Sequence, residues 1–112
     1  MPQVPHNQVK TQFDICIVNY NTKELTNACL NHIISVIQND QCNIWVVDNG
    51  STDGSVEMLE SIPKIKLIKR TPDQAEEGHT AHAIAIDLVF NNTSKPYLVL
   101  MHTDTIVYSP LA

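Results

Sequence analysis

The segment 44–55 constrains the fold of this chain more than any other part of the sequence. Its apolar run 44–47 is typical of a buried strand. Asp48 follows the run directly, and Gly50 and Gly54 come shortly after it. A carboxylate and two glycines at this place predict a tight turn and the start of a helix. In an open α/β sheet, ligands bind beyond the carboxyl ends of the strands, where glycine turns present free N–H groups. The segment is therefore either an ordinary capped turn or a nucleotide or phosphate site.

Apolar runs and amphipathic segments alternate along the chain. Three short runs rich in apolar residues are expected to form central strands: 13–18, 44–47 and 97–101. Two longer segments have the apolar period of a helix: 25–38 and 75–91. Between them, residues 64–69 alternate lysine with apolar residues, as an edge strand does. A short helix is expected near Met58, before Pro63.

This alternation predicts an α/β fold with a mostly parallel sheet, right-handed crossovers and helices on both faces. The expected strand order is about 3-2-1-4, as in a Rossmann-like half-domain. Residues 1–12 are polar and carry two prolines, so we expect a flexible tail there. Residues 13–112 are expected to form one domain, incomplete at its C-terminal end, with an uncovered apolar flank that favours self-association.

The composition argues against some classes of binding partner. The net charge is −5 and no run of lysine or arginine occurs, which argues against nucleic acid or anionic lipid as the main partner. A diphosphate ligand would need a metal ion or backbone dipoles. No apolar stretch approaches the roughly 20 residues of a membrane span. Three cysteines without zinc-ligand spacing, in a chain without a signal peptide, predict a cytoplasmic protein.

Polar turns follow the three strongly apolar strands. Asn19, Asp48 and the pair His102 and Asp104 each stand directly after one of them. Because parallel strands end at the same edge of a sheet, we expect Asp48 and Asp104 to lie across one shared cleft. Asp48 is suited to accept a hydrogen bond from a ring N–H or a sugar hydroxyl. Asp104 and His102 are suited to hold Mn²⁺ or Mg²⁺ beside a diphosphate.

Four segments of this chain resemble the nucleotide-binding half of a family 2 glycosyltransferase. They are residues 18–22, 29–30, 45–55 and 97–105, and the similarity covers roughly residues 13–110. The resemblance implies the GT-A fold. It also implies transfer of a sugar from a nucleotide-diphosphate sugar donor to an unknown glycan or lipid-linked acceptor, with Mn²⁺ or Mg²⁺ bridging the diphosphate of the donor.

The resemblance also assigns site residues. Those expected to bind the donor are Asn19, Tyr20, Asn21, Asp48, Asn49, Gly50, Gly78 and His79. Asp104 takes the place of the second acid of the family's metal-binding Asp-x-Asp motif. His102 stands in the place of the first acid, which removes one negative charge and puts the metal preference in question.

Two other interpretations remain open. The family's general base lies well beyond its Asp-x-Asp motif, and no residue here is a good candidate for it. The chain is therefore either the donor-binding part of a sugar transferase or a non-catalytic α/β module that binds a nucleotide or a protein. Separately, His79, His82 and His102 are a weak candidate for a zinc site.

Overall fold

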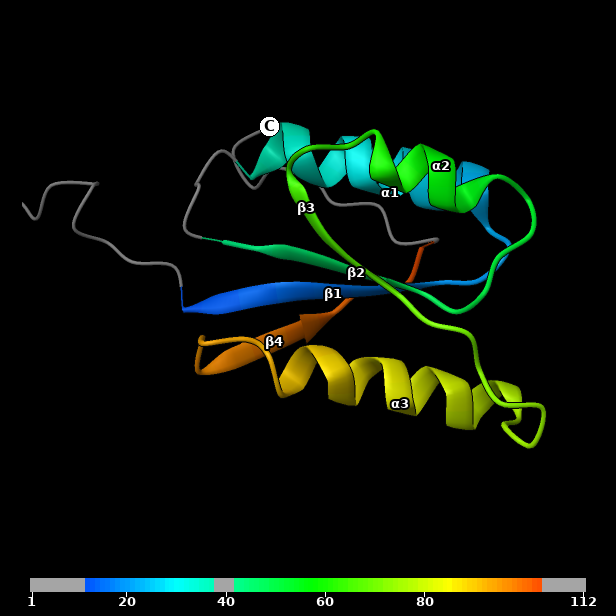
Figure 1. The fold of residues 1–112 in the computed structure, drawn as a ribbon. Helices are drawn as coiled ribbons and strands as arrows, with labels where there is room; N and C mark the ends of the chain where they lie inside the picture. Colours follow the sequence, from blue (N-terminus) through cyan, green and yellow to red (C-terminus); the bar gives the residue numbers. More distant parts are fainter. Residues whose placement is uncertain (1–11, 38–41, 104–112) are drawn as a thin grey trace, which may run out of the picture.

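Four strands and three helices alternate along the described part of the chain. The computed structural model describes residues 12–37 and 42–103 (Figure 1). In chain order the elements are β1 (Phe13–Asn19), α1 (Lys23–Val36), β2 (Ile44–Asp48), α2 (Ser55–Glu60), β3 (Ile65–Lys69), α3 (Gly78–Phe90) and β4 (Tyr97–Leu100). The tail predicted for residues 1–12 lies outside the described residues, apart from Gln12.

The four strands form one parallel sheet in the order β3-β2-β1-β4. Helices α1 and α2 cover one face of the sheet, and α3 covers the other (Figure 1). The predicted fold class and strand order are therefore confirmed. The register pairs Asn19 with Asp48, so the ends of β1 and β2 lie side by side at the carboxyl edge.

Alternate residues of the strands build two separate core layers, because successive side chains of a strand point to opposite faces. Ile15, Ile17 and Val46 pack with α1 and α2 on one face. Cys16 and Val47 pack on the other face against small residues of α3. Strands buried on both faces explain why β1 and β2 have near-continuous apolar runs.

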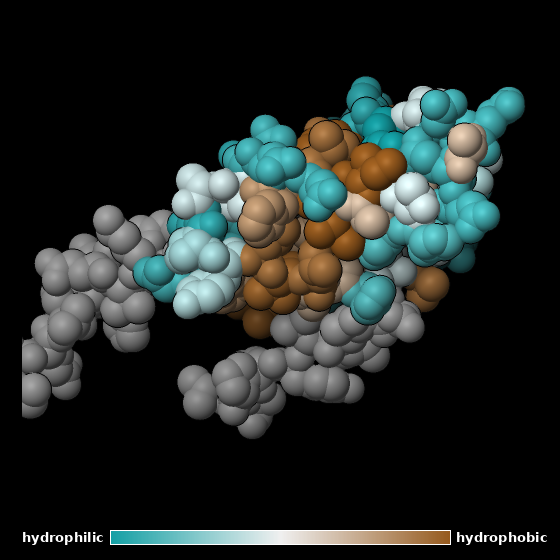
Figure 2. Space-filling model, turned by 90° about the horizontal axis from the view of Figure 1, so that it is seen from below, coloured by the Kyte–Doolittle hydropathy of each residue, from teal (hydrophilic) through white to brown (hydrophobic). Residues whose placement is uncertain are grey.

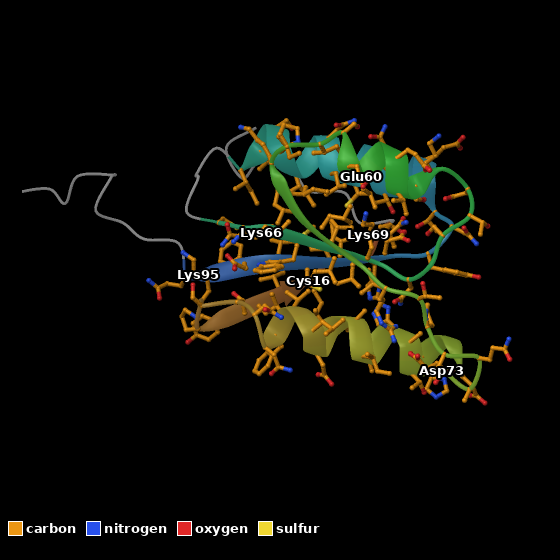
Figure 3. All side chains as sticks on the ribbon, viewed as in Figure 1. Cys16, Glu60, Lys66, Lys69, Asp73 and Lys95 are labelled. Atoms are coloured by element: carbon orange, nitrogen blue, oxygen red, sulfur yellow. The ribbon has the colours of Figure 1, made fainter. Side chains whose placement is uncertain are left out.

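Strand β3 is an edge strand among the described strands, as its lysines predicted. The side chain of Lys69 makes a 3.0 Å ion pair with Glu60 of α2, and Lys66 lies over the ring of Trp45, with 4.9 Å from its ammonium to the ring centroid (Figure 3). Charged side chains on an edge strand discourage pairing with another chain. This edge is therefore protected.

Strand β4 differs from the prediction that residues 97–101 form a central strand. Within the described residues β4 pairs only with β1 and has a free edge. Three of its four side chains are open to solvent, with exposed fractions of 67% for Tyr97, 40% for Val99 and 50% for Leu100, whereas Leu98 packs against the core on the α3 face. Figure 2 shows hydrophobic surface gathered on the side of the molecule that carries α3 and β4. An apolar run alone cannot distinguish a strand buried within the chain from one that stays uncovered.

The helices differ in detail from their predicted bounds. Helix α3 begins at Gly78, three residues after the predicted start, because residues 73–76 form a separate turn in which the N–H of Glu76 donates to the carbonyl of Asp73.

Within the described residues, none of the helices has both the length and the apolar character needed to cross a membrane.

Asp14 holds together the edge of the sheet opposite to the predicted site. Its fully buried carboxylate accepts hydrogen bonds from the backbone N–H of Asn43 at 2.9 Å, the indole N–H of Trp45 at 3.0 Å and the hydroxyl of Thr93 at 2.7 Å. Burial alone would raise the pKa of Asp14, but the hydrogen bonds outweigh burial and lower this pKa below its ordinary value. Asp14 thus ties the connection before β4 to β1 and β2.

Replacing Asp14 tests this role. We expect Asp14→Asn to lower the free energy of unfolding at neutral pH by roughly 3 kcal/mol, because buried donors lose a charged acceptor. Since the folded state lowers the pKa of Asp14 from its ordinary 3.8, the carboxylate stabilises the fold above that value and this stabilisation is lost as the pH falls through the lower folded pKa. Urea unfolding from pH 7 to pH 2 should therefore show a shallower acid slope in the variant.

The control for this experiment is Asp87→Asn, on the exposed surface of α3. It removes the same charge without touching a buried donor and should leave stability and acid slope near those of the parent. An Asp14→Asn protein as stable as the Asp87→Asn protein would contradict the role of Asp14.

The free edge of β4 generates a second prediction. We expect the chain to self-associate, because an uncharged, exposed strand edge offers both unpaired backbone groups and apolar surface. Val99→Lys should reduce this association in sedimentation velocity over a range of concentrations. The control is Leu25→Lys on α1, since Leu25 is also an exposed apolar residue, with 52% of its surface exposed. A parent chain that is monomeric at every concentration would contradict the prediction.

Candidate functional site

Two loops meet at the carboxyl edge of the sheet, one after β1 and one after β2. The side-chain amide of Asn19, at the end of β1, donates to a carboxylate oxygen of Asp48 at 2.7 Å. Both residues are buried, with 1% of Asp48 exposed. The structure thus brings together two of the predicted site residues, which are 29 positions apart in the sequence.

The carboxylate of Asp48 accepts all of its hydrogen bonds from residues of these two loops. One oxygen accepts from the Asn19 amide and from the hydroxyl of Ser51 at 2.6 Å. The other accepts from the backbone N–H of Gly50 at 3.2 Å and of Ser51 at 2.9 Å. A carboxylate offers about four acceptor positions, so these four bonds saturate it. Asp48 shapes the turn in this structure, and its contact with a nucleoside stays a prediction.

Asn19 is the second centre of the network. Its side-chain oxygen accepts from the hydroxyls of Thr22 at 3.0 Å and Thr26 at 2.6 Å, both at the start of α1. Thr22 stands at the cap position of α1 but makes no side-chain cap bond to the helix backbone. The Asn19 amide therefore links the turn after β2 to the helix after β1.

Further contacts join the two loops. Asn21 has a φ of 52°, its N–H donates to the Ser51 hydroxyl at 2.9 Å, and its side-chain oxygen accepts from the N–H of Thr52 at 2.8 Å. Asp53 accepts from the N–H of Lys23 and of Ser55, both at 3.0 Å, and so caps the first turns of α1 and α2 together. The hydroxyl of Ser55 is the main cause of the lowered pKa of Asp53.

Arg70, which no sequence pattern singled out, joins a third loop to the site. Its guanidinium donates to the side-chain oxygen of Asn49 at 2.8 Å and to Glu76 at 2.7 Å. The ion pair is largely buried, and the hydrogen bond from Arg70 lowers the pKa of Glu76. The amide of Asn49 in turn donates to the carbonyl of Ala81 in α3 at 3.2 Å. In the sequence, Arg70 follows several lysines, and the signal that separates it from them is that it is the single arginine of the chain, the residue type favoured in buried ion pairs.

A cleft of about 590 Å³ opens between these loops and α3. Four predicted donor-binding residues line it: Tyr20, Asn49, Gly50 and Gly78. Residues that the sequence analysis did not assign to donor binding also line it, among them Thr22, Thr71, Pro72, Glu76, His82 and Thr103. Gly50 is required there for two reasons. Its φ is +82°, and a Cβ atom would lie 3.3 Å from the Cδ of Pro72.

The remaining predicted residues take other places. Hydrogen bonds of Asn19, Asn21 and Asp48 join the two loops to each other, and these three residues are not among those that line the cleft. His79 is exposed and lies 3.7 Å from Glu77, also apart from the lining residues. Asp104 lies outside the described residues, so its predicted position across the cleft from Asp48 is not tested.

His102, the other predicted metal ligand, lies next to His82 of α3. The two rings are nearly parallel, with 6.2 Å between centroids and 10° between planes. Within residues 12–37 and 42–103, three or more His, Cys, Asp or Glu side chains nowhere gather as a metal site would need. The zinc site of three histidines is therefore not formed among them. His82 and His102 offer imidazole nitrogens, which suit Mn²⁺ or Zn²⁺ better than Mg²⁺.

Ser51 offers a test of the loop network. Its hydroxyl accepts from Asn19 and Asn21 and donates to Asp48, so Ser51→Ala leaves three polar groups short of a partner. We expect a loss of about 2 kcal/mol in the free energy of unfolding, measured by urea denaturation. Ser35→Ala removes an exposed hydroxyl that bonds only locally and is the control. Equal stability of the two variants would contradict the network.

Comparisons with known proteins agree with the fold. The solved structure of the mannosyltransferase PcManGT from Pyrobaculum calidifontis, in complex with GDP-Man and Mn²⁺, superposes with a TM-score of 0.66 at 18% sequence identity. The match covers 92% of this chain and 30% of the mannosyltransferase, and shows that the fold is GT-A-like. A comparison with curated protein sequences finds no match.

The family follows from a comparison of the sequence with protein-family models. The model described as glycosyl transferase family 2 matches residues 14–110, which include every described strand and helix but the first residue of β1. The chain belongs to glycosyl transferase family 2.

Proposed function

We propose that the cleft binds the nucleoside diphosphate part of a sugar donor, and that the protein containing this domain transfers the sugar to a glycan or lipid-linked acceptor. The observation that carries this proposal is the pair of cross-linked loops at the carboxyl edge, with the cleft beside them. Family membership supports it, as does the GDP-Man and Mn²⁺ bound by the structurally similar mannosyltransferase.

The nucleoside is proposed to lie against Tyr20. This side chain lines the cleft and is 59% exposed, so a flat base can stack on it without disturbing the core. Asn49 and Gly50 stand beside it on the second loop. Asp48 remains our candidate for a contact with the base or ribose, which would replace one of its present hydrogen bonds.

A diphosphate is strongly negative, and a metal ion would neutralise its charge in this acidic chain. The chain has a net charge of −5, and the one guanidinium near the cleft is already paired with Glu76. We propose that His102 and Asp104 hold the metal, as the resemblance predicted. The ion would neutralise the diphosphate and so stabilise it as a leaving group. The imidazole at position 102 favours Mn²⁺ over Mg²⁺.

The chain spans about 30% of the length of the mannosyltransferase that it resembles. A cytoplasmic location remains a proposal drawn from the cysteine pattern. The competing function is a non-catalytic α/β module that binds a nucleotide or a protein, because such a module needs no turnover. Release of free nucleotide from a panel of nucleotide sugars with Mn²⁺ separates them.

Tyr20→Ala tests the nucleoside position. Loss of one stacked aromatic ring costs about 1–3 kcal/mol per base, so affinity for the preferred nucleoside diphosphate should fall about tenfold. Isothermal titration calorimetry with uridine, thymidine and guanosine diphosphates, each with Mn²⁺, measures this. Phe90→Ala is the control, because Phe90 is an equally exposed aromatic residue at the far end of α3.

The same titrations without Mn²⁺ isolate the role of the metal. Asp104→Ala should abolish the metal-dependent part of the binding and leave the metal-free part unchanged. Failure of the parent chain to bind any nucleoside diphosphate would overturn the proposed donor site. Equal binding by the Tyr20→Ala and Phe90→Ala proteins would show that the base does not lie against Tyr20.

A further inference from the structure

Arg70 lies directly behind the cleft. It is the single arginine of the chain, and only 14% of its side chain is exposed. It is not among the residues that line the cleft, but three residues to which its side chain donates are lining residues: Asn49, Glu76 and Ala81. An effect of Arg70 on a ligand in the cleft must therefore pass through these three residues.

The two terminal nitrogens of the guanidinium have different partners. Nη1 donates to the side-chain oxygen of Asn49 at 2.8 Å and to the carbonyl of Ala81 at 3.3 Å, and Nη2 donates to Glu76 at 2.7 Å. The backbone N–H of Arg70 donates to the carbonyl of Asp48 at 2.9 Å, so the side chain starts from a fixed point at the end of the β2–β3 ladder. One side chain thus sets the spacing between the loop after β2, the turn before α3 and α3 itself.

This set of bonds requires an arginine. A guanidinium is planar and presents its donors in a fixed fork, whereas an ammonium is a compact charge at the end of a flexible chain. A lysine at position 70 could neutralise Glu76, but it could not hold Asn49 and Ala81 at the same time. The geometry of the cleft therefore depends on the shape of this side chain as well as on its charge.

The ion pair also sets the charge of the cleft. Glu76 is the only acidic residue among the described residues that line it, and 13% of its side chain is exposed. The hydrogen bond from Arg70 lowers the pKa of Glu76, so this carboxylate is ionised at neutral pH. Without Arg70, the charge of Glu76 would be unpaired and would repel a diphosphate in the cleft.

We infer that Arg70 is a positioning residue for donor binding. It holds three lining residues at a fixed spacing and neutralises the carboxylate of Glu76, which allows the cleft to accept a diphosphate. This role rests on the proposed function, because it concerns the ligand that the proposed function assigns to the cleft. Arg70 acts through its neighbours, whereas Tyr20 is proposed to touch the donor itself.

The test compares a charged ligand with its neutral part. Each variant is titrated with uridine, thymidine and guanosine diphosphates and with the corresponding nucleosides, in EDTA, so that the diphosphate keeps its full charge. Chemical shifts in ¹H–¹⁵N spectra follow weak binding of both kinds of ligand. Arg70→Gln should weaken diphosphate binding about tenfold or more and nucleoside binding by a smaller factor, since Glu76 repels only the diphosphate.

Two further variants separate charge from geometry. The double variant Arg70→Gln, Glu76→Gln has the net charge of the parent and no unpaired carboxylate, so it should recover the charge-dependent part of the loss. Arg70→Lys keeps the positive charge without the fork, so it should weaken both kinds of ligand by a similar factor of about three to ten.

The matched control is Lys69→Gln. Lys69 precedes Arg70 and also pairs with a glutamate, but its ion pair with Glu60 is exposed, and neither residue lines the cleft. This variant removes the same charge and should bind every ligand as the parent does. Thermal unfolding confirms that each variant is folded at the temperature of the titrations.

The outcomes are distinct. Parent-like diphosphate binding by the folded Arg70→Gln protein would overturn the role of Arg70 and leave the donor site standing. Equal losses for diphosphate and nucleoside, with no recovery in the double variant, would also overturn it, because a purely structural role does not distinguish the two ligands. A parent chain that binds none of the three nucleoside diphosphates, in EDTA or with Mn²⁺, would overturn the proposed function and the role of Arg70 together.

Discussion

The hydrogen bond between Asn19 and Asp48 is the contact on which the rest of the site depends. It joins the ends of two adjacent parallel strands, and from it bonds extend through Ser51 to the second loop and through Thr26 to α1. A buried carboxylate is costly unless its acceptor positions are filled, and here neighbouring N–H and O–H groups fill all of them. The shape of both loops therefore follows from the requirement to satisfy one buried charge.

Each edge of the sheet buries one aspartate carboxylate, and the two carboxylates accept hydrogen bonds from different parts of the fold. At the amino edge, Asp14 is satisfied by groups from β2 and from the connection before β4, and so fixes the frame. At the carboxyl edge, Asp48 is satisfied mainly by its own turn, which leaves the adjoining cleft open for a ligand. Arg70 links that cleft to α3 through Asn49 and Ala81, so the floor and one wall of the cleft are held as a unit.

The charges of the site agree with a donor that binds together with a metal ion. Arg70 is engaged by Glu76, and the chain as a whole is acidic. An anionic ligand in this cleft therefore needs a cation from elsewhere. Under the proposed function, His102 would offer that cation an imidazole nitrogen in the place where the family's motif has a carboxylate oxygen.

The sequence by itself determined the order of strands and helices, the parallel sheet and the edge at which polar turns gather, because apolar periodicity and the handedness of crossovers leave few alternatives. It also identified Tyr20, Asn49, Gly50 and Gly78, which line the cleft. Only the tertiary structure decided which polar residues line the cleft. It also decided that others, such as Asn19 and Asp48, make hydrogen bonds within the loops and do not line the cleft. It alone revealed the contacts of Arg70 and the free edge of β4 among the described strands. These depend on contacts between residues far apart in the chain, which local periodicity does not encode.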